Sequence, residues 1–173
     1  MITRYLNSSD LEAVSAIRLR TRQTSYRGII DDVYLDSLSI KHYREKVKHM
    51  CTLSQNGEAH GLIAEGDDGT VLGFLIGVVS SKNVSDVSHE IYALYVDPDC
   101  QWQGVGKALF SAFVERVTQE NGTGFFARTA KENMPTRAFY EKRGGVAMEE
   151  SAVTLGEKDY PIVCYTWKMS DAV

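Results

Sequence analysis

The sequence predicts an α+β fold, in which about four helices lie on both faces of a mixed, mostly antiparallel, curved sheet of about seven strands. Two observations support this class. Apolar residues alternate with polar ones in short runs between turn signals, and elsewhere they recur at spacings of three and four, so strands and helices follow one another in mixed order. With 173 residues, 43% of them hydrophobic and 24% charged, the chain is long enough for one core. We therefore expect residues 1–173 to form a single domain.

The first third of the chain is predicted to be mainly helical. Ser9 and Glu12 have the spacing of a capping box, and Ser39 is a suitable cap for a later helix. The elements expected here are a strand at 2–6, a helix at 9–23, a loop at 24–32, a helical turn at 33–38 and a helix at 40–49.

From residue 59 onward, strands and helices are predicted to alternate. The turn at 66–69 contains an Asp-Gly pair, which is typical of a β-hairpin, and Pro98 must end the strand before it because proline has no N–H to donate. The elements expected here are strands at 61–65, 71–80 and 90–96, a helix at 105–121, a strand at 125–130, a helix at 135–143, and strands at 146–155 and 160–167.

Composition excludes several classes of function. The 19 Lys and Arg against 23 Asp and Glu give a net charge of −4, so we expect no broad basic surface for nucleic acid or for an anionic membrane. The three cysteines, Cys51, Cys100 and Cys164, are far apart and include no CxxC pair, which favours a reducing compartment. The longest apolar run, Val71–Val79, is far shorter than the roughly 20 residues of a spanning helix. These observations predict a cytoplasmic protein without a metal site.

The most informative segment is the run from Gln101 to Lys107. A predicted strand ends before it and a helix begins within it, so unpaired backbone N–H groups and the positive helix end converge there, as in an anion-binding loop. Gly104 and Gly106 allow the backbone to approach a phosphate closely. A Walker loop would need glycine at Gln101, and a dinucleotide fingerprint would need glycine at Leu109, so neither motif is present.

Two linked motifs identify a family resemblance. The run Gln101–Gly106, preceded by the strand Glu90–Val96, and the later run Asn133–Gly144, which contains Phe-Tyr-Glu-Lys, are similar to the motifs of the GCN5-related N-acetyltransferase (GNAT) family. The resemblance implies an acyltransferase that uses acetyl-CoA as its acetyl donor and no metal. The coenzyme-binding residues that it implies are Leu94, Tyr95, Val96, Gln101, Trp102, Gln103, Gly104, Val105, Gly106, Lys107, Asn133, Arg137 and Tyr140.

The resemblance also implies how the reaction proceeds. Tyr140 has the position of the general acid that protonates the leaving thiolate, and Glu90 or a water path would take the proton of the amine. A backbone N–H of Leu94–Val96 would stabilise the oxyanion during direct transfer in a ternary complex. Tyr140 as a core tyrosine and Glu90 as a solvated strand end are the competing structural interpretations. A thiol acyl carrier built from Cys100 and His89 is a further alternative.

The acceptor is the least specified part of the prediction. Tyr26 and Tyr34 lie in the region that would cover the acceptor, and Asp31 and Asp32 there could attract a cationic amine. We therefore expect a primary amine of a small molecule, polyamine-like or otherwise, or of a peptide. The second hypothesis, from another class, is a catalytically silent acetyl-CoA-binding regulatory or interaction domain. A homodimer is expected from the family resemblance, and His42, His49 and His60 are expected at the surface.

Overall fold

The computed structural model describes the backbone of residues 1–169, and the side chains of these except 81–83 and 149. The strands are β1 Ile2–Tyr5, β2 Ala59–Glu65, β3 Val71–Val84, β4 Val87–Val96, β5 Gly124–Ala130, β6 Val146–Leu155 and β7 Lys158–Lys168. The helices are α1 Leu11–Ser25, α2 Asp32–Ser37, α3 Ile40–Gln55, α4 Val105–Gln119 and α5 Met134–Glu141, with short 3₁₀ turns η1 Ser8–Asp10 and η2 Pro98–Cys100.

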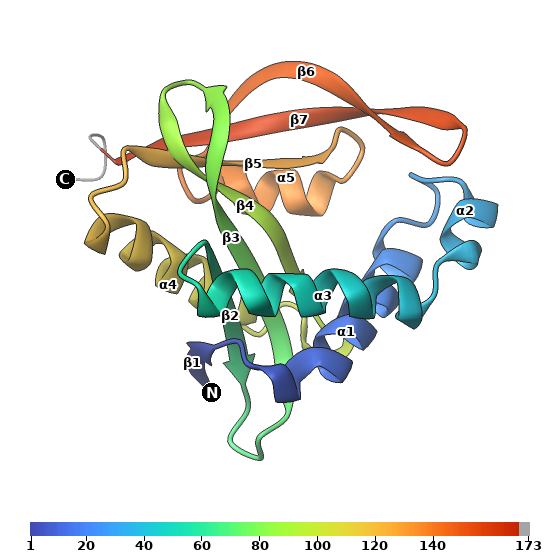
Figure 1. Ribbon diagram of the computed structural model, residues 1–173. Coiled ribbons are helices and arrows are strands. Elements are labelled where there is room, and N and C mark those ends of the chain that lie inside the picture. The colour runs from blue at the N-terminus through green and yellow to red at the C-terminus, as the bar shows by residue number, and fades with distance from the viewer. Residues whose placement is uncertain (170–173) are drawn as a thin grey trace.

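All seven strands form one sheet in the order β1-β2-β3-β4-β5-β7-β6 (Figure 1). Neighbouring strands are antiparallel except β4 and β5, which are parallel because α4 connects them as a crossover. The predicted fold class is therefore confirmed, including the mixed but mostly antiparallel sheet.

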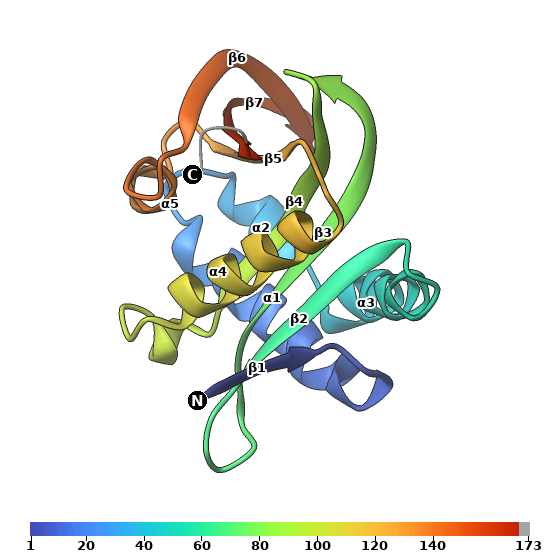
Figure 2. The ribbon, with the colours of Figure 1, turned by 90° about the vertical axis from the view of Figure 1, so that its left-hand side faces the viewer.

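Helices cover both faces of the sheet, as Figure 2 shows with α3 on one side and α4 on the other. The buried cluster beneath α1 and α3 includes Val14, Val47 and Phe74, which pack between these helices and β3. The opposite cluster beneath α4 and α5 is larger and more aromatic, and includes Phe113 and Tyr140. The two clusters fix both helical layers on the sheet, so the ends of β4 and β5 are rigidly supported.

The hairpin between β3 and β4 is longer than the sequence predicts. A polar loop was expected from 81 to 89, but β3 extends to Val84 and β4 begins at Val87. Ser85 and Asp86 have φ values of 52° and 60°, the left-handed conformation at both central positions of a type I′ turn. The sequence of this arm is mainly polar, so it lacks the apolar alternation that would predict strands there.

The helices differ from the prediction mainly at their ends. The capping box belongs to Asn7 and Asp10, since the Asn7 side chain accepts from Ser9 N at 2.9 Å and Asp10 accepts from Asn7 N at 2.9 Å. The expected box at Ser9 was therefore wrong. The third helix continues to Gln55 instead of ending at His49, and α5 ends at Glu141. Among residues 1–169, no helix is long and apolar enough to cross a membrane.

Candidate active site

The parallel strands β4 and β5 separate after a short stretch of pairing. Only His89–Ile91 of β4 pairs with β5, whereas pairing of β4 with β3 continues to Val96. A register shift between Ile76 and Gly77 of β3 leaves Tyr92 as an extra residue at the point where β5 departs. The stretch Tyr92–Val96 therefore has one edge without a neighbouring strand, which we call the open edge of β4.

The direction of the backbone groups on the open edge follows from the ladder to β3. Asp97 N donates to Leu72 O at 2.9 Å, so the alternation of an antiparallel pair directs the N–H and C=O groups of residues 93, 95 and 97 to β3. Leu94 and Val96 consequently direct theirs to the open edge. Their side chains pack with the cluster beneath α4, whereas Tyr95 packs with the cluster beneath α1 and α3.

The loop after β4 presents a series of unoccupied backbone donors. Among the described residues, none accepts a hydrogen bond from the backbone N–H groups of 101–107, and the first bond of the helix is Ala108 N to Gly104 O at 3.0 Å. Trp102 and Gly104 have positive φ values of 64° and 88°, so the chain reverses direction within the loop. Consecutive free amides at the N-terminus of a 15-residue helix form a strong anion site.

The loop side chains support this backbone geometry. Gln101 donates to Val96 O at 3.4 Å and Gln103 donates to Asp99 O at 3.2 Å, which brace the turn from within. Trp102 is 88% exposed, whereas Val105 is buried and anchors the start of α4. A Cβ on Gly106 would lie 3.2 Å from the Phe139 ring, so glycine there lets α5 approach the loop.

Asn133 and Arg137 hold the start of α5 beside β5. Asn133 is buried and its side-chain oxygen accepts from Thr136 N at 3.2 Å, which caps the helix. Arg137 donates to Tyr165 Oη and to Lys131 O, each at 3.1 Å. The Arg137 guanidinium is thus already occupied by contacts that fix α5, so Lys107 is the freer of the two cations in the predicted coenzyme-binding set.

Tyr140 combines a buried ring with a polar neighbourhood at its hydroxyl group. The side chain is 4% exposed and packs against Tyr165 and Trp167, with ring centroids 5.6 and 5.4 Å away. Burial raises the pKa of Tyr140 well above its usual range, and the nearby Tyr26 and Tyr95 hydroxyls raise it further. The phenol is therefore fully protonated at neutral pH, which is the form a general acid requires.

Glu90 lies at the start of the stretch where β4 and β5 pair. Because Ile91 faces the cluster beneath α4, the alternation of a strand directs Glu90 to the opposite face of the sheet. There its carboxylate pairs with Arg128 of β5, with Nη2 and Oε1 2.8 Å apart. Glu90 is a paired carboxylate on the face of the sheet opposite α4, not a solvated strand end.

Tyr26 and Tyr34 lie in different surroundings. Burial raises the pKa of Tyr26 most strongly, and the Tyr95 hydroxyl adds to it, while Arg22 and the Asn133 side chain oppose the shift. Tyr26 therefore shares one neighbourhood with Tyr95, Tyr140 and Asn133. Tyr34 instead packs on the β6–β7 turn, where a Cβ on Gly156 would lie 3.2 Å from its ring.

The carboxylates near Tyr34 are already paired. Asp31 forms an ion pair with Lys158, and Asp32 lies 3.2 Å from Arg27. The expected attraction of a cationic amine to this pair of residues is therefore largely neutralised.

Two arginines of α1, Arg18 and Arg22, were not predicted from the sequence but lie among the tyrosines of the site. Their spacing of four residues on a helix face that carries Val14 and Thr21 was an available signal.

The expected surface position of His60 was wrong. His60 and His89 are buried, and their Nε2 atoms lie 3.1 and 3.4 Å from Oε2 of Glu120. Together these groups have the donor atoms of a metal site, but Arg116 Nε lies 3.8 Å from the other Glu120 oxygen and would repel a cation. His89 Nε2 lies within hydrogen-bond distance of Glu120, whereas His60 Nε2 has no hydrogen-bond partner among the described residues, and we assign this cluster no part in the active site.

The alternative thiol mechanism is not supported by the geometry. His89 lies near the beginning of β4 and Cys100 follows its end, so roughly 20 Å of extended strand separates them. Burial, followed by Asp97 and Asp99, raises the pKa of the Cys100 thiol, which disfavours a reactive thiolate.

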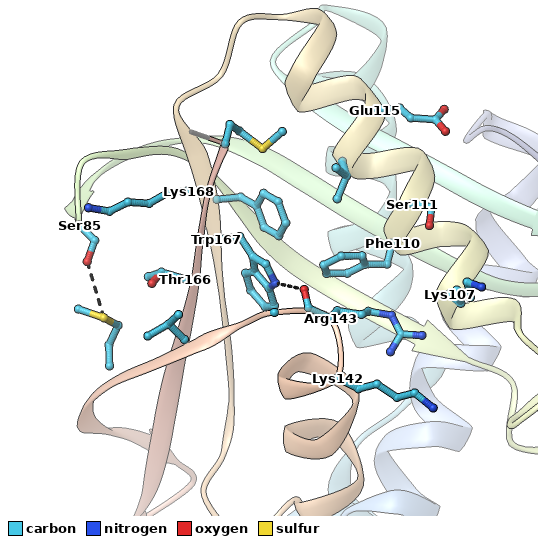
Figure 3. A pocket seen from close by; sticks show the side chains of 16 residues that line it. Ser85, Lys107, Phe110, Ser111, Glu115, Lys142, Arg143, Thr166, Trp167 and Lys168 are labelled. Carbon is cyan, nitrogen blue, oxygen red and sulfur yellow. Dashed lines mark hydrogen bonds between the residues drawn. The ribbon is translucent and has the colours of Figure 1, made fainter. Parts of the chain in front are cut away.

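A cavity of about 1140 Å³ lies between α4, the end of α5 and β7. Figure 3 shows Trp167 and Phe110 within it and Lys107, Lys142 and Arg143 gathered on one side. Of the predicted site residues only Lys107 lines it, and neither Tyr140 nor Glu90 does.

The splayed parallel strands beside an amide-lined loop and a protonated tyrosine define the class of acetyl-CoA-dependent N-acetyltransferases. The comparison with protein families agrees. Residues 13–145 match the acetyltransferase (GNAT) family, and the chain belongs to this family.

Individual relatives are consistent with the family assignment. The uncharacterized N-acetyltransferase YuaI of Bacillus subtilis (strain 168) is 29% identical over 143 residues, which are 82% of this chain and 78% of that protein. The PaiA N-acetyltransferase of Thermoplasma acidophilum, in complex with coenzyme A, superposes with a TM-score of 0.77 at 22% identity, over 96% of this chain and 98% of that one. A YncA protein of Salmonella typhimurium, described as a putative acetyltransferase with acetyl-CoA, gives 0.72 at 16% identity over 97% and 93%. At these identities the two structures show a shared fold.

Proposed function

We propose that the protein transfers the acetyl group of acetyl-CoA to the primary amine of a small molecule or peptide, by direct attack in a ternary complex. The observation that carries this proposal is the series of unoccupied amides at 101–107, immediately after an open strand edge. The pyrophosphate would bind these amides, and the pantetheine arm would pair with Leu94 and Val96 like an added strand. The Thermoplasma protein in complex with coenzyme A and the Salmonella protein with acetyl-CoA support coenzyme binding by a chain of this fold.

Further coenzyme contacts are assigned to side chains around the loop. Asn133 is buried on the β5 side and would face the arm from there, while Lys107 at the cavity rim would bind an outlying phosphate. Tyr95 contributes its backbone to the strand and its ring to the face of the sheet covered by α1 and α3, which we call the acceptor face because the amine would approach from it. In this arrangement the thioester carbon lies near the open edge, between the acceptor face and Tyr140.

The chemistry requires the attacking nitrogen to lose two protons and the departing sulfur to gain one. An alkyl amine with a pKa of about 10.4 must first lose a proton, which costs about 4.6 kcal/mol at pH 7, and Glu90 or a water held by it accepts that proton. The amine nitrogen then attacks the thioester carbon, and an N–H on the open edge stabilises the oxyanion. The carbon–sulfur bond breaks, and Tyr140 gives its proton to the departing thiolate. The second proton of the attacking nitrogen returns through water to the Tyr140 phenolate, and Glu90 releases the first proton to solvent before the next turnover.

The test is a thiol-release assay with saturating acetyl-CoA and a panel of primary amines. Acceptor-dependent release of coenzyme A thiol, with the acetylated amine identified by mass spectrometry, is the expected result. Saturable binding of acetyl-CoA without release for any amine would contradict the proposal and support a silent coenzyme-binding domain instead.

The predicted homodimer remains a proposal with a direct test. The edge strand β6 exposes Val146, Met148 and Val153, an apolar strip of the kind that a second subunit covers. Sedimentation equilibrium is expected to give twice the mass of the 19.3 kDa chain, and a monomer at all concentrations would contradict it.

A further inference from the structure

Two arginines of α1 lie at the acceptor face without a carboxylate partner. Arg18 is only 8% exposed, and its Nε and Nη1 atoms have no hydrogen-bond partner among the described residues. The Nε atom of the half-buried Arg22 is likewise unpartnered. None of the ion pairs found within residues 1–169 includes either guanidinium. Buried charges are normally paired, because desolvation of an isolated charge costs several kcal/mol.

Tyrosine rings surround both guanidinium groups. The Arg18 Cζ atom lies 5.0 Å from the centroid of Tyr43 and 5.7 Å from those of Tyr92 and Tyr95. The Arg22 Cζ atom lies 4.8 Å from the centroid of Tyr26. Cation–π contacts of this kind make a buried guanidinium tolerable, but a ring face accepts no directed hydrogen bond from several N–H groups. The Nε and Nη1 donors of Arg18 and the Nε donor of Arg22 therefore remain available to a ligand.

The two arginines share their neighbours with the proposed reaction site. Tyr26 and Tyr95, which contact them, are the residues whose hydroxyls raise the pKa of Tyr140. The same two hydroxyls, with that of Tyr43, raise the pKa of Arg22 although burial alone would lower it. Thr21 of the same helix turn donates to Val96 O at 3.1 Å, on the open edge of β4. A group bound by Arg18 and Arg22 would thus lie beside the open edge of β4, where the proposed function places the thioester.

The carboxylates of α1, α2 and the loop after β4 do not compensate this positive charge. The acidic residues of α1, α2 and the loop after β4 are each paired with a different cation: Glu12 with Arg44, Asp31 with Lys158, Asp32 and Asp36 with Arg27, and Asp97 and Asp99 with Arg20. A polyamine in this position would meet two guanidinium groups and be repelled. An anionic group would instead be attracted by both.

We propose that the acceptor is an amino acid, whose carboxylate binds Arg18 and Arg22 while its amine attacks acetyl-CoA. The proposal deepens the proposed acetyl transfer and rests on it. A carboxylate can accept two parallel N–H bonds from one guanidinium and further bonds from the second, which supplies the missing partners of both side chains. The short distance between the amine and carboxylate of an amino acid matches a guanidinium pair placed beside the reaction site.

Matched acceptors test the carboxylate requirement. The standard amino acids are compared with their carboxamides, with the corresponding decarboxylated amines, and with a linear diamine, all at saturating acetyl-CoA. The best amino acid is expected to exceed its own carboxamide in kcat/KM by about 10- to 100-fold, the range for loss of charge-assisted hydrogen bonds. Equal or better turnover of the carboxamide, the decarboxylated amine or the diamine would overturn the proposal while leaving acetyl transfer intact. If none of the acceptors is acetylated, the proposed acetyl transfer itself is contradicted.

Variants separate carboxylate binding from a structural role of the arginines. Arg18→Gln and Arg22→Gln are each expected to raise KM for the amino acid by about 10- to 100-fold with a smaller change in kcat, and to leave the carboxamide unaffected. Arg18→Lys is expected to recover part of the loss. Arg44→Gln, which removes an exposed arginine of α3, is the matched control and is expected to leave KM and kcat unchanged for both the amino acid and the carboxamide.

Binding is measured independently of turnover by thermal melting of the protein with coenzyme A. The preferred amino acid is expected to raise the melting temperature of the unaltered chain but not that of Arg18→Gln or Arg22→Gln, and its carboxamide to raise neither. The proposal is overturned if both substitutions reduce activity equally for amino acid and carboxamide, or if amino acid and carboxamide stabilise the unaltered chain equally.

Discussion

Removal of the Tyr140 hydroxyl is the perturbation that separates chemistry from packing most clearly. In Tyr140→Phe the ring keeps its contacts with Tyr165 and Trp167, and no hydrogen bond to a described residue is lost. The free energy of unfolding is therefore expected to change by less than about 1 kcal/mol. Loss of a general acid typically reduces kcat by 10²- to 10⁴-fold, which corresponds to about 2.7 to 5.5 kcal/mol in the barrier.

Tyr165→Phe is the matched control, because the two rings are neighbours but only the Tyr165 hydroxyl forms hydrogen bonds to described residues. The Tyr165 hydroxyl donates to Glu141 at 2.6 Å and accepts from Arg137 at 3.1 Å. Its removal breaks two hydrogen bonds, so we expect a loss of about 1 to 3 kcal/mol in stability with little change in kcat.

The assay combines steady-state thiol release, coenzyme affinity by calorimetry and chemical denaturation for both variants. The predicted pattern is opposite in the two proteins: Tyr140→Phe loses turnover but keeps affinity and stability, and Tyr165→Phe loses stability but keeps turnover. A Tyr140→Phe enzyme with undiminished kcat would refute the assignment of the general acid.

Three further predictions concern the loop, the base and the pH dependence. Gly104→Val forces a branched residue to a φ of 88°, so the backbone amides of the loop should turn away from the coenzyme. The Kd for coenzyme A, measured by calorimetry, should rise at least about 100-fold, while the free energy of unfolding falls by only about 1–3 kcal/mol. Unchanged affinity would disprove the role of the loop. Glu90→Gln should lower kcat/KM about 100-fold at pH 7 and less at pH 10, where the amine loses its proton unaided, so an equal loss at both values would argue against a base. Because burial holds the pKa of Tyr140 above its ordinary value, the phenol stays protonated and kcat/KM should show no decline from this residue up to pH 10. The same pKa shift stabilises the folded state at pH values below the ordinary pKa of tyrosine. This contribution should be lost as the pH rises through the higher folded-state pKa, which pH-dependent denaturation can show.

The sequence predicted best what depends on local chemistry. Alternating apolar residues, the Asp-Gly turn and the spacing of three and four in Val105–Val117 define elements that form with little help from distant contacts. The loop at 101–107 was predicted for the same reason, since glycine spacing and a helix start are visible in sequence. The hairpin turn at Ser85 and Asp86 was missed because its arm has no apolar alternation to reveal it.

Contacts between distant elements were less accessible. The ion pair of Glu90 with Arg128 joins two parallel strands, and the burial of His60 results from its packing beside Phe113 of α4. The arginines of α1 become part of the candidate site only through their contacts with tyrosines of α3 and β4. These features depend on tertiary register, which a single sequence does not encode as a local pattern.

The most direct test of the account is to locate coenzyme A on the protein by amide NMR. On titration with coenzyme A, the largest shift changes and the strongest protection from hydrogen exchange are expected at the amides of 101–107, followed by Leu94 and Val96. If those amides do not respond while others respond elsewhere, such as those around His60 and Glu120, the site described for the coenzyme would be contradicted.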